Sequence, residues 1–191
     1  LGSLLANDSD ADGDELYADI AGAPGSAGGV FTVDDSLQLT FDPAGDFEDL
    51  GAGETRQTSF TYTVNDNHGG SMQAVVAVTV TGANDSPEAL DDHFDAGSHV
   101  AVSLGSPLLN DSDIDSDPLR VIGFRIEGLA ERFGTGGTAS MDGIGELTLQ
   151  ADGNYVFVPV AGRSGPVPLV TYALSDGAQS AEATLSISVT E

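Results

Sequence analysis

The stretch FTYTVND, residues 60–66, returns as VTYALSD at residues 170–176. Apolar side chains alternate with polar ones in these copies, at Phe60, Tyr62, Val64, Tyr172 and Leu174. A period of two is typical of a β-strand with one face in a core and the other in solvent. The same alternation follows each copy, in MQAVVAVTV (72–80) and in AEATLSISV (181–189). These pairs of segments predict an all-β fold.

The repeat extends outward from these strands to the opening of each copy. LGSLLANDSDADGDEL (1–16) and LGSPLLNDSDIDSDPL (104–119) share 11 of 16 residues without a gap. We therefore predict two domains, 1–83 and 84–191, with a linker at 82–90. Short strands separated by the turn signals VDDS (33–36) and ADGN (151–154) indicate tandem immunoglobulin-like or cadherin-like Greek-key β-sandwiches.

Residues 86–103 should supply the first strands of the second domain. The first copy has no counterpart of this segment, because Leu1 aligns with Leu104. The first domain is therefore predicted to lack its N-terminal strand, which leaves an open sheet edge.

The charge of the chain restricts its partners. Thirty-one acidic residues face five arginines and no lysine, giving a net charge of −26. Such a charge repels nucleic acid and anionic membranes, and no apolar run is long enough for membrane insertion in this fragment. The net charge has three alternative explanations, which are a solvated acidic surface, a salt-adapted proteome and bound divalent metal. Cysteine is absent, so thiolate metal sites and disulfides are excluded.

The acidic residues concentrate in two matched segments. Asp8, Asp10, Asp12 and Asp14 recur in register as Asp111, Asp113, Asp115 and Asp117. A loop curled around a cation would relieve the repulsion among them, and an oxygen-only ligand set favours Ca²⁺ over zinc or copper. The first copy also fits the start of an EF-hand loop. The second copy does not, because Ser116 replaces the glycine and Ile122 stands at the last ligand position.

Catalytic motifs are not evident in the sequence. No nucleophile elbow, phosphate-binding loop or HExxH pattern places serine, histidine and aspartate for chemistry. We therefore predict that the chain is not an enzyme.

Residues 50–87, LGAGETRQTSFTYTVNDNHGGSMQAVVAVTVTGANDSP, resemble the C-terminal half of a VCBS repeat. Such repeats occur in large secreted bacterial adhesins of the RTX type. Residues 84–191 resemble a related bacterial cadherin-like module. The resemblance implies calcium held between successive domains, by a basal glutamate, a linker Asn-Asp pair and two aspartate loops of the next domain.

Carried onto this chain, the resemblance implies a ligand set at the junction. The basal glutamate matches Glu54, the linker pair Asn84 and Asp85, the first loop Asp113 and Asp115, and the second loop Asp176. Neighbouring carboxylates that could complete the shell are Asp91, Asp92, Asp111 and Asp117. The corresponding loops of the first domain contain Asp8, Asp10, Asp12, Asp14 and Asp66. The second domain reads AGRSGPVP where the first has LGAGE, so it offers no basal glutamate of its own.

Two functions fit these patterns. The first is a calcium-binding extender module of a large secreted or surface bacterial adhesin, in which calcium rigidifies the interdomain joint for cell adhesion or biofilm formation. Its partners would be neighbouring repeats of the same chain and a cell-surface or matrix glycan or protein, outside the cell. The alternative is a calcium-dependent glycan-binding module of a secreted protein. Low aromatic content and the absence of tryptophan favour the first.

Overall fold

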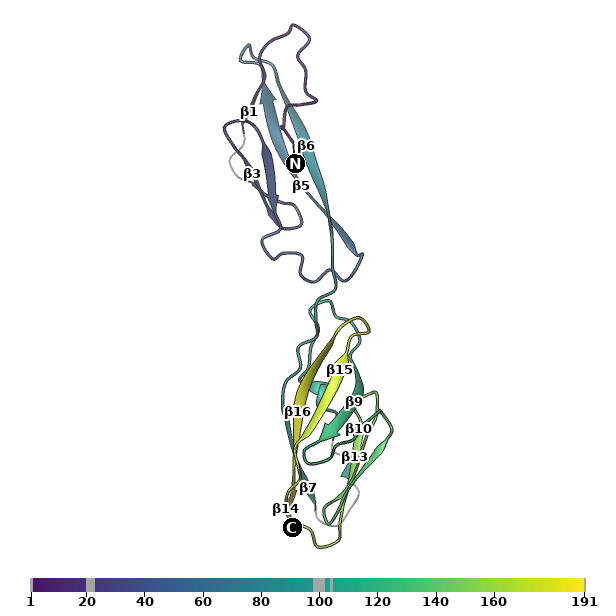
Figure 1. The fold of residues 1–191 in the computed structure, drawn as a ribbon. Coiled ribbons are helices and arrows are strands. Elements are labelled where there is room, and N and C mark those ends of the chain that lie inside the picture. The colour runs from purple at the N-terminus through teal and green to yellow at the C-terminus, as the bar shows by residue number, and fades with distance from the viewer. Residues whose placement is uncertain (1, 20–22, 98–101, 104, 191) are drawn as a thin grey trace. The chain divides into compact units, whose positions relative to one another are not determined.

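The computed structural model describes residues 2–19, 23–97, 102–103 and 105–190, and it confirms the all-β fold (Figure 1). The chain forms two compact units, unit 1 (Leu1–Asn84) and unit 2 (Asp85–Glu191). In the part of the chain that the structure describes, the one helical element is a single 3₁₀ turn, η1 (Pro107–Leu109). No helix there is long and apolar enough to cross a membrane.

Unit 1 contains two antiparallel sheets. One has the order β1-β5-β6 and the other β2-β3-β4. Their bounds are β1 (Tyr17–Asp19), β2 (Ala23–Pro24), β3 (Val30–Val33), β4 (Leu39–Asp42), β5 (Thr55–Asn65) and β6 (Ser71–Thr81). The core cluster consists of Leu4, Phe31, Leu39, Phe60 and Tyr62. Phe60 and Tyr62 belong to the alternating stretch, so its predicted inward face is confirmed.

Unit 2 also contains two sheets. One has the order β10-β9-β15-β16-β14, with β7 paired to β16, and the other has the order β11-β12-β13-β8. The first sheet comprises β7 (Asp92–Gly97), β9 (Arg120–Ile126), β10 (Arg132–Phe133), β14 (Gly165–Pro166), β15 (Val170–Ser175) and β16 (Ser180–Thr190). The second comprises β8 (Val102–Ser103), β11 (Thr138–Met141), β12 (Gly145–Leu149) and β13 (Tyr155–Pro159). Both sheets contribute to one core, in which Leu147, Phe157, Tyr172 and Leu185 are fully buried.

Both predicted turn signals close hairpins. In VDDS, the Asp34 carboxylate accepts hydrogen bonds from the amides of Ser36 and Gln38. This turn connects β3 to β4, which pair as an antiparallel hairpin. In ADGN, Asp152 accepts from the Asn154 amide, and Gly153 adopts a φ of 80° between β12 and β13. The turns form because short acidic side chains bond the local backbone and glycine tolerates positive φ.

The repeated strands pair in the same register in both units. Tyr62 on β5 lies opposite Ala74 on β6, and Tyr172 on β15 lies opposite Ala183 on β16. One difference separates the units. In unit 2, β7 pairs in parallel with the edge of β16 that faces away from β15, whereas no described strand occupies that edge of β6. Among the described residues, unit 1 therefore has no strand paired at the position that β7 occupies in unit 2.

Candidate metal centre

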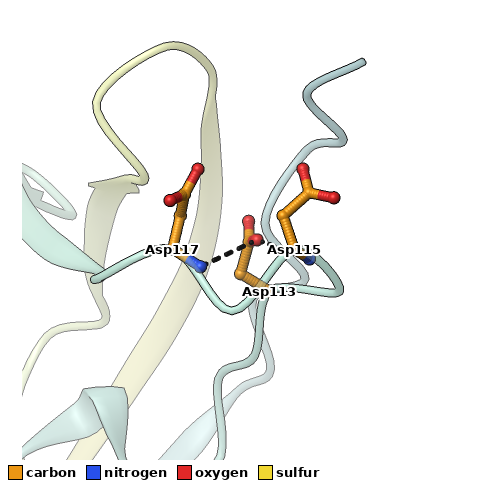
Figure 2. A group of neighbouring side chains, drawn as sticks. All are labelled: Asp113, Asp115 and Asp117. Carbon is orange, nitrogen blue, oxygen red and sulfur yellow. Dashed lines mark hydrogen bonds between the residues drawn. The ribbon is translucent and has the colours of Figure 1, made fainter. Parts of the chain in front are cut away.

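The second copy of the acidic motif forms a curled loop in unit 2. The Asp113 Oδ1 atom accepts hydrogen bonds from the amides of Asp115, at 3.0 Å, and Asp117, at 3.3 Å. Figure 2 shows the second of these bonds. Ser116 adopts a φ of 64°, and Gly13 occupies the same position of the first copy with a φ of 83°. The Gly-to-Ser difference between the copies therefore preserves the loop conformation.

The three carboxylates of this loop gather into one group. One oxygen each from Asp113, Asp115 and Asp117 lie within 4.8 Å of one another (Figure 2). The Asp85 amide donates to Asp115 Oδ2 at 2.7 Å, which fixes the start of unit 2 against the loop. No other group of three acidic or histidine side chains is gathered as closely in the described part of the chain.

Two oxygens in this group have no hydrogen-bond partner. Asp113 Oδ2 and Asp115 Oδ1 are both buried and unbonded. A buried carboxylate oxygen without a partner costs free energy, and three clustered carboxylates add mutual repulsion. A hard divalent cation would offset both costs, because it binds the unpartnered oxygens and neutralises the carboxylate charges. Ca²⁺ takes six to eight oxygen ligands in irregular geometry. The residues present therefore fit a calcium ion.

Three other predicted ligands in unit 2 bond to protein groups. Asp91 accepts from the Thr184 amide at 2.8 Å, and Asp111 accepts from the Leu90 amide at 2.8 Å. Asp92 accepts from the Tyr172 hydroxyl at 3.0 Å. These bonds hold the segment that leads into β7 and the start of the acidic motif, so the three carboxylates have a structural role in this arrangement.

The environment of Asp92 and Asp111 differs from that of exposed carboxylates. Burial raises the pKa of Asp92 to about 6, and the negative charges of Asp111 and Asp91 add to this effect. Burial also raises the pKa of Asp111. The Thr184 hydroxyl and amide instead hold the pKa of Asp91 below its ordinary value.

The second predicted loop contains Asp176. Its Oδ1 atom accepts from the amides of Ala178 and Gln179, both at 2.6 Å. The corresponding Asp66 of unit 1 accepts from the amides of His68, at 2.7 Å, and Gly70, at 2.9 Å. These hydrogen bonds, that of His68 first, lower the pKa of Asp66. In each aspartate, therefore, a single carboxylate oxygen accepts the two amide hydrogen bonds that close the turn. The turn follows β15 in unit 2 and β5 in unit 1.

The first copy of the acidic motif forms the same kind of loop. Asp10 Oδ1 accepts from the amides of Asp12, at 2.8 Å, and Asp14, at 3.2 Å. Asp14 also lies 3.3 Å from His68 Nδ1. Asp8, Asp10 and Asp66 line one open cavity of about 320 Å³. Unit 1 thus preserves the fold of the loop without gathering three carboxylates as closely as unit 2.

The two remaining predicted ligands belong to unit 1. Glu54 is exposed, and its Oε2 atom accepts from the Gly51 amide at 3.3 Å. Its carbonyl oxygen accepts from the Gly82 amide, which ties the chain after β6 to the start of β5. Asn84 is the last residue of unit 1 and is half-buried. That Glu54 and Asn84 share an ion with unit 2 stays a prediction.

Sequence reasoning missed the two tyrosines that hold the motifs in place. The Tyr172 hydroxyl lies 3.1 Å from Asp111 Oδ2 and 3.3 Å from the Pro107 carbonyl oxygen. In unit 1, the Tyr62 hydroxyl lies 3.0 Å from Asp8 Oδ2 and 3.4 Å from the Leu4 carbonyl oxygen. The signal was the tyrosine common to FTYTVND and VTYALSD, which alternation alone assigned to the core.

Comparisons with known proteins place this architecture. The structure is similar to the crystal structure of human protocadherin-24 EC1-2 form II, with a TM-score of 0.53, 18% identity, and coverage of 95% of this chain and 84% of that chain. It is also similar to mouse cadherin-23 EC22-24, with a TM-score of 0.52, 11% identity, and coverage of 96% and 56%. No curated protein matches the sequence. The bacterial cadherin-like domain family matches residues 1–82 and 84–191. The chain therefore belongs to the bacterial cadherin-like domain family.

Proposed function

We propose that the two units are calcium-binding structural repeats of a secreted or surface bacterial adhesin, of the RTX type that the VCBS resemblance implies. Membership in the cadherin-like family supports a structural module of the adhesion type. The observation that carries calcium binding is the pair of buried, unbonded oxygens, Asp113 Oδ2 and Asp115 Oδ1. In this proposal they are ligands, together with a carboxylate oxygen of Asp117.

Further ligands come from the residues around this loop. Asp176 lies in the turn after β15, where the family resemblance places a ligand, and Asp85 adjoins the acidic loop through its amide. The family resemblance adds Glu54 and Asn84 from unit 1. With these residues, the ion would join two units and restrict their relative motion, since an ion bound only by the ordered joint stabilises that joint by mass action.

Charge supports the same proposal. At −26, the chain gains stability from any cation that lowers the repulsion among its carboxylates. The matched aspartate loops concentrate that repulsion at positions where a divalent ion reduces it most. Extension of many such repeats away from a cell would support adhesion and biofilm formation.

Glycan binding is less well supported by the exposed surface. Sugar rings stack on exposed aromatic side chains, and among the described phenylalanine and tyrosine rings only that of Tyr17, at 43%, is exposed. The other described aromatic rings are buried or half-buried.

Calorimetric titration with calcium tests the proposed site. Asp113→Asn combined with Asp115→Asn should lower the affinity of the unit 2 site at least tenfold, since each change removes a charged ligand. Asp142→Asn is the matched control, because Asp142 is an exposed aspartate in a hairpin turn of the same unit. Equal calcium affinity in the double variant and the control would refute the assignment.

Small-angle scattering tests the structural role. The chain with calcium should show a narrower distribution of dimensions and a higher melting temperature than the chain with chelator. Identical maximum dimensions and melting temperatures in the two conditions would rule out rigidification, even if calorimetry shows that calcium binds.

A further inference from the structure

The solvent face of the first sheet in unit 2 contains a hollow over β9, β10, β15 and β16. Its volume is about 300 Å³. Gly123 and Ala173, which pair across β9 and β15, line this hollow and contribute little side-chain volume. All of the lining residues lie between positions 122 and 182, in the described part of the chain. The hollow is therefore formed by unit 2 alone.

A β-bulge gives the hollow its shape. The pairing of β9 with β15 shifts between Ala173 and Leu174, which leaves Ile122 as an extra residue of β9. Bulges redirect side chains, and Ile122, 54% exposed, lines the hollow. Gly123 allows β10 to approach closely, because a Cβ atom at this position would lie 2.9 Å from the Phe133 carbonyl oxygen. The bulge and the glycine therefore leave an open floor beside one exposed apolar side chain.

Three charged side chains gather around this floor. Arg125 and Arg132 lie directly opposite each other on β9 and β10, so their side chains project from the same face. The Arg125 guanidinium donates two hydrogen bonds to the Glu182 carboxylate, at 2.8 and 2.9 Å. The hydrogen bond from Arg125 is the largest cause that lowers the pKa of Glu182, and the charge of Arg132 adds to it. In the described part of the chain, no hydrogen bond or ion pair involves the Arg132 guanidinium.

The charge at this hollow is opposite to that of the rest of the chain. With 31 acidic residues and five arginines, most of the surface repels an anion. At the hollow, two arginines outnumber the one glutamate, and Arg125 already pairs with that glutamate. The planar guanidinium of Arg132 is thus left to bind a carboxylate, with which it can form two parallel hydrogen bonds.

The other polar groups indicate that the ligand also has hydroxyl groups. The Glu182 carboxylate accepts hydrogen bonds, and the hydroxyl of Thr171, which lines the same hollow, both donates and accepts them. A uronic acid has a carboxylate and neighbouring hydroxyls on one ring, so it can satisfy Arg132 and Glu182 together. A ligand with a second carboxylate at this distance would instead be repelled by Glu182. Ile122 and Ala173 offer apolar contact to the C–H groups of the ring.

A second hollow adjoins the first. Its volume is about 380 Å³, and both hollows are lined by Arg125 and Thr171. Leu129 and Leu169, 37% and 40% exposed, also line the second hollow. Two hollows that share an arginine offer room for successive units of a chain, which favours a polysaccharide over a free hydroxy acid.

We propose that the two hollows bind an acidic polysaccharide, with the carboxylate of one uronic acid unit on Arg132 and its hydroxyls on Glu182 and Thr171. The neighbouring unit of the polysaccharide occupies the second hollow. Charge-assisted hydrogen bonds supply the recognition, so binding requires neither an exposed aromatic ring nor calcium. This site would add attachment to the structural role of the module, and it does not rest on the calcium site.

Titration with α-1,4-linked trigalacturonate, followed by amide chemical shifts, tests the proposal. Chelator is present throughout, so that no divalent ion bridges the ligand and the protein. The shifts should change saturably at residues 122–125 and 171–173. Methyl esterification of the trisaccharide should weaken binding at least tenfold, because it removes the charge that Arg132 binds. Monomeric galacturonate should also bind at least tenfold more weakly, because it leaves the second hollow empty.

Variants of the chain test the assigned contacts. Arg132→Gln should lower the affinity for trigalacturonate at least tenfold. Arg120→Gln is the matched control, because Arg120 is an exposed arginine of β9 that lines neither hollow, and its loss changes the net charge equally. The control should change the affinity less than threefold. Ala173→Leu should abolish binding at constant charge, because the larger side chain fills the floor, and its melting temperature shows whether it is folded.

Several results would overturn the proposal. These are the absence of saturable shifts at the hollow, equal affinity of Arg132→Gln and Arg120→Gln, and equal affinity for trigalacturonate and its methyl ester. Equal affinity for the monomer would overturn the polysaccharide assignment. A tri-aspartate peptide that binds at the hollow as tightly as trigalacturonate would assign the site to an acidic protein segment instead. Calcium affinity is measured separately on the aspartate variants, so a negative result here leaves the calcium proposal intact.

Discussion

Tyr155 and Tyr172 are fully buried tyrosines of the same core, and their hydroxyl groups have opposite surroundings. The Tyr172 hydroxyl lies between the carboxylates of Asp92 and Asp111, whereas the Tyr155 hydroxyl has no hydrogen-bond partner. Burial is the largest cause that raises the pKa of both phenols. Tyr172 therefore joins the acidic motif to the core, and Tyr155 contributes packing alone.

The two tyrosines make a matched pair for mutation. Tyr172→Phe should lower the free energy of unfolding of unit 2 by about 1–3 kcal/mol, because it leaves buried carboxylate oxygens short of a donor. Tyr155→Phe should change it little or raise it, since a buried hydroxyl without a partner is removed. Urea unfolding followed by circular dichroism measures both. Equal losses in the two variants would contradict the assigned role of Tyr172.

The raised pKa of Asp92 predicts a pH dependence at the same site. The folded state holds the proton to about pH 6, and the unfolded chain releases it near its ordinary value of 3.8. Stability from this group is therefore greatest in mild acid and falls as the pH rises from about 4 to above 6. The shift of about two units corresponds to ~3 kcal/mol before screening, and partial exposure reduces it to about 1 kcal/mol.

Asp92→Asn tests this dependence in the presence of chelator. The variant should be more stable than the parent at pH 7.5 by about 1 kcal/mol and nearly equal to it at pH 4, since asparagine resembles the protonated acid. Asp142→Asn serves as the exposed control and should follow the parent at both pH values. A parent that gains stability relative to Asp92→Asn as the pH rises would show that Asp92 favours folding in its charged form, against this prediction.

At the scale of elements, Gly153 couples the β12–β13 hairpin to η1. Gly153 has a φ of 80°, and a Cβ atom there would lie 2.0 Å from Ser106 Oγ. Ser106 Oγ accepts from the Leu108 amide at 3.2 Å and so caps η1. The hairpin turn and the helical turn before the acidic motif therefore share one close contact.

Gly153→Ala should destabilise unit 2 by about 2 kcal/mol or more, from left-handed backbone strain together with displacement of the Ser106 cap. Gly143→Ala is the control, because Gly143 has a φ of 69° in the neighbouring hairpin with no atom within 4 Å of its Cβ position. Gly143→Ala should lower the free energy of unfolding by about 1 kcal/mol, because it adds backbone strain and no side-chain contact. Thermal unfolding of the two variants separates the terms, and similar losses would show that the contact with η1 contributes nothing.

The sequence predicted the strands and turns whose patterns span only a few neighbouring residues. Alternation placed Phe60 and Tyr62 on an inward face, and Asp34 and Asp152 marked hairpin turns, because each signal spans only a few residues. It did not reach the pairing of Asp91 with Thr184, 93 residues apart, or of Tyr172 with Asp111, 61 residues apart. Such contacts depend on which strands become neighbours, and a periodic pattern does not specify that.

The sequence predicted the conformation of the two acidic loops, and their role as metal ligands stays a prediction. The recurring aspartates predicted curled loops, and Asp10 and Asp113 form them with the same pair of amide bonds. Equal spacing in the sequence did not predict that Asp113, Asp115 and Asp117 would gather while their counterparts in unit 1 would not. Nor did it predict that the Asp92 carboxylate would accept a hydrogen bond from the Tyr172 hydroxyl.

At the scale of the whole molecule, the net charge of −26 predicts a strong salt dependence of stability. Without calcium, raising NaCl from about 0.05 M to about 0.5 M should raise the melting temperatures, because the Debye length shortens and the carboxylates repel one another less. With saturating calcium the same change should have a smaller effect, since bound ions already offset part of the repulsion. Calorimetry measures both series, and equal salt dependence in each would contradict a charge-relieving role for calcium.

The acidic loops are folded by their own amide bonds before any ion is considered. Asp113 receives two of them, and Asp10 receives two in the other unit. Capture of an ion then requires the exchange of water for carboxylate oxygens rather than the ordering of a chain segment. Filling and emptying of such loops should therefore be fast compared with unfolding, so a string of these modules would stiffen or relax in step with the calcium concentration of its surroundings.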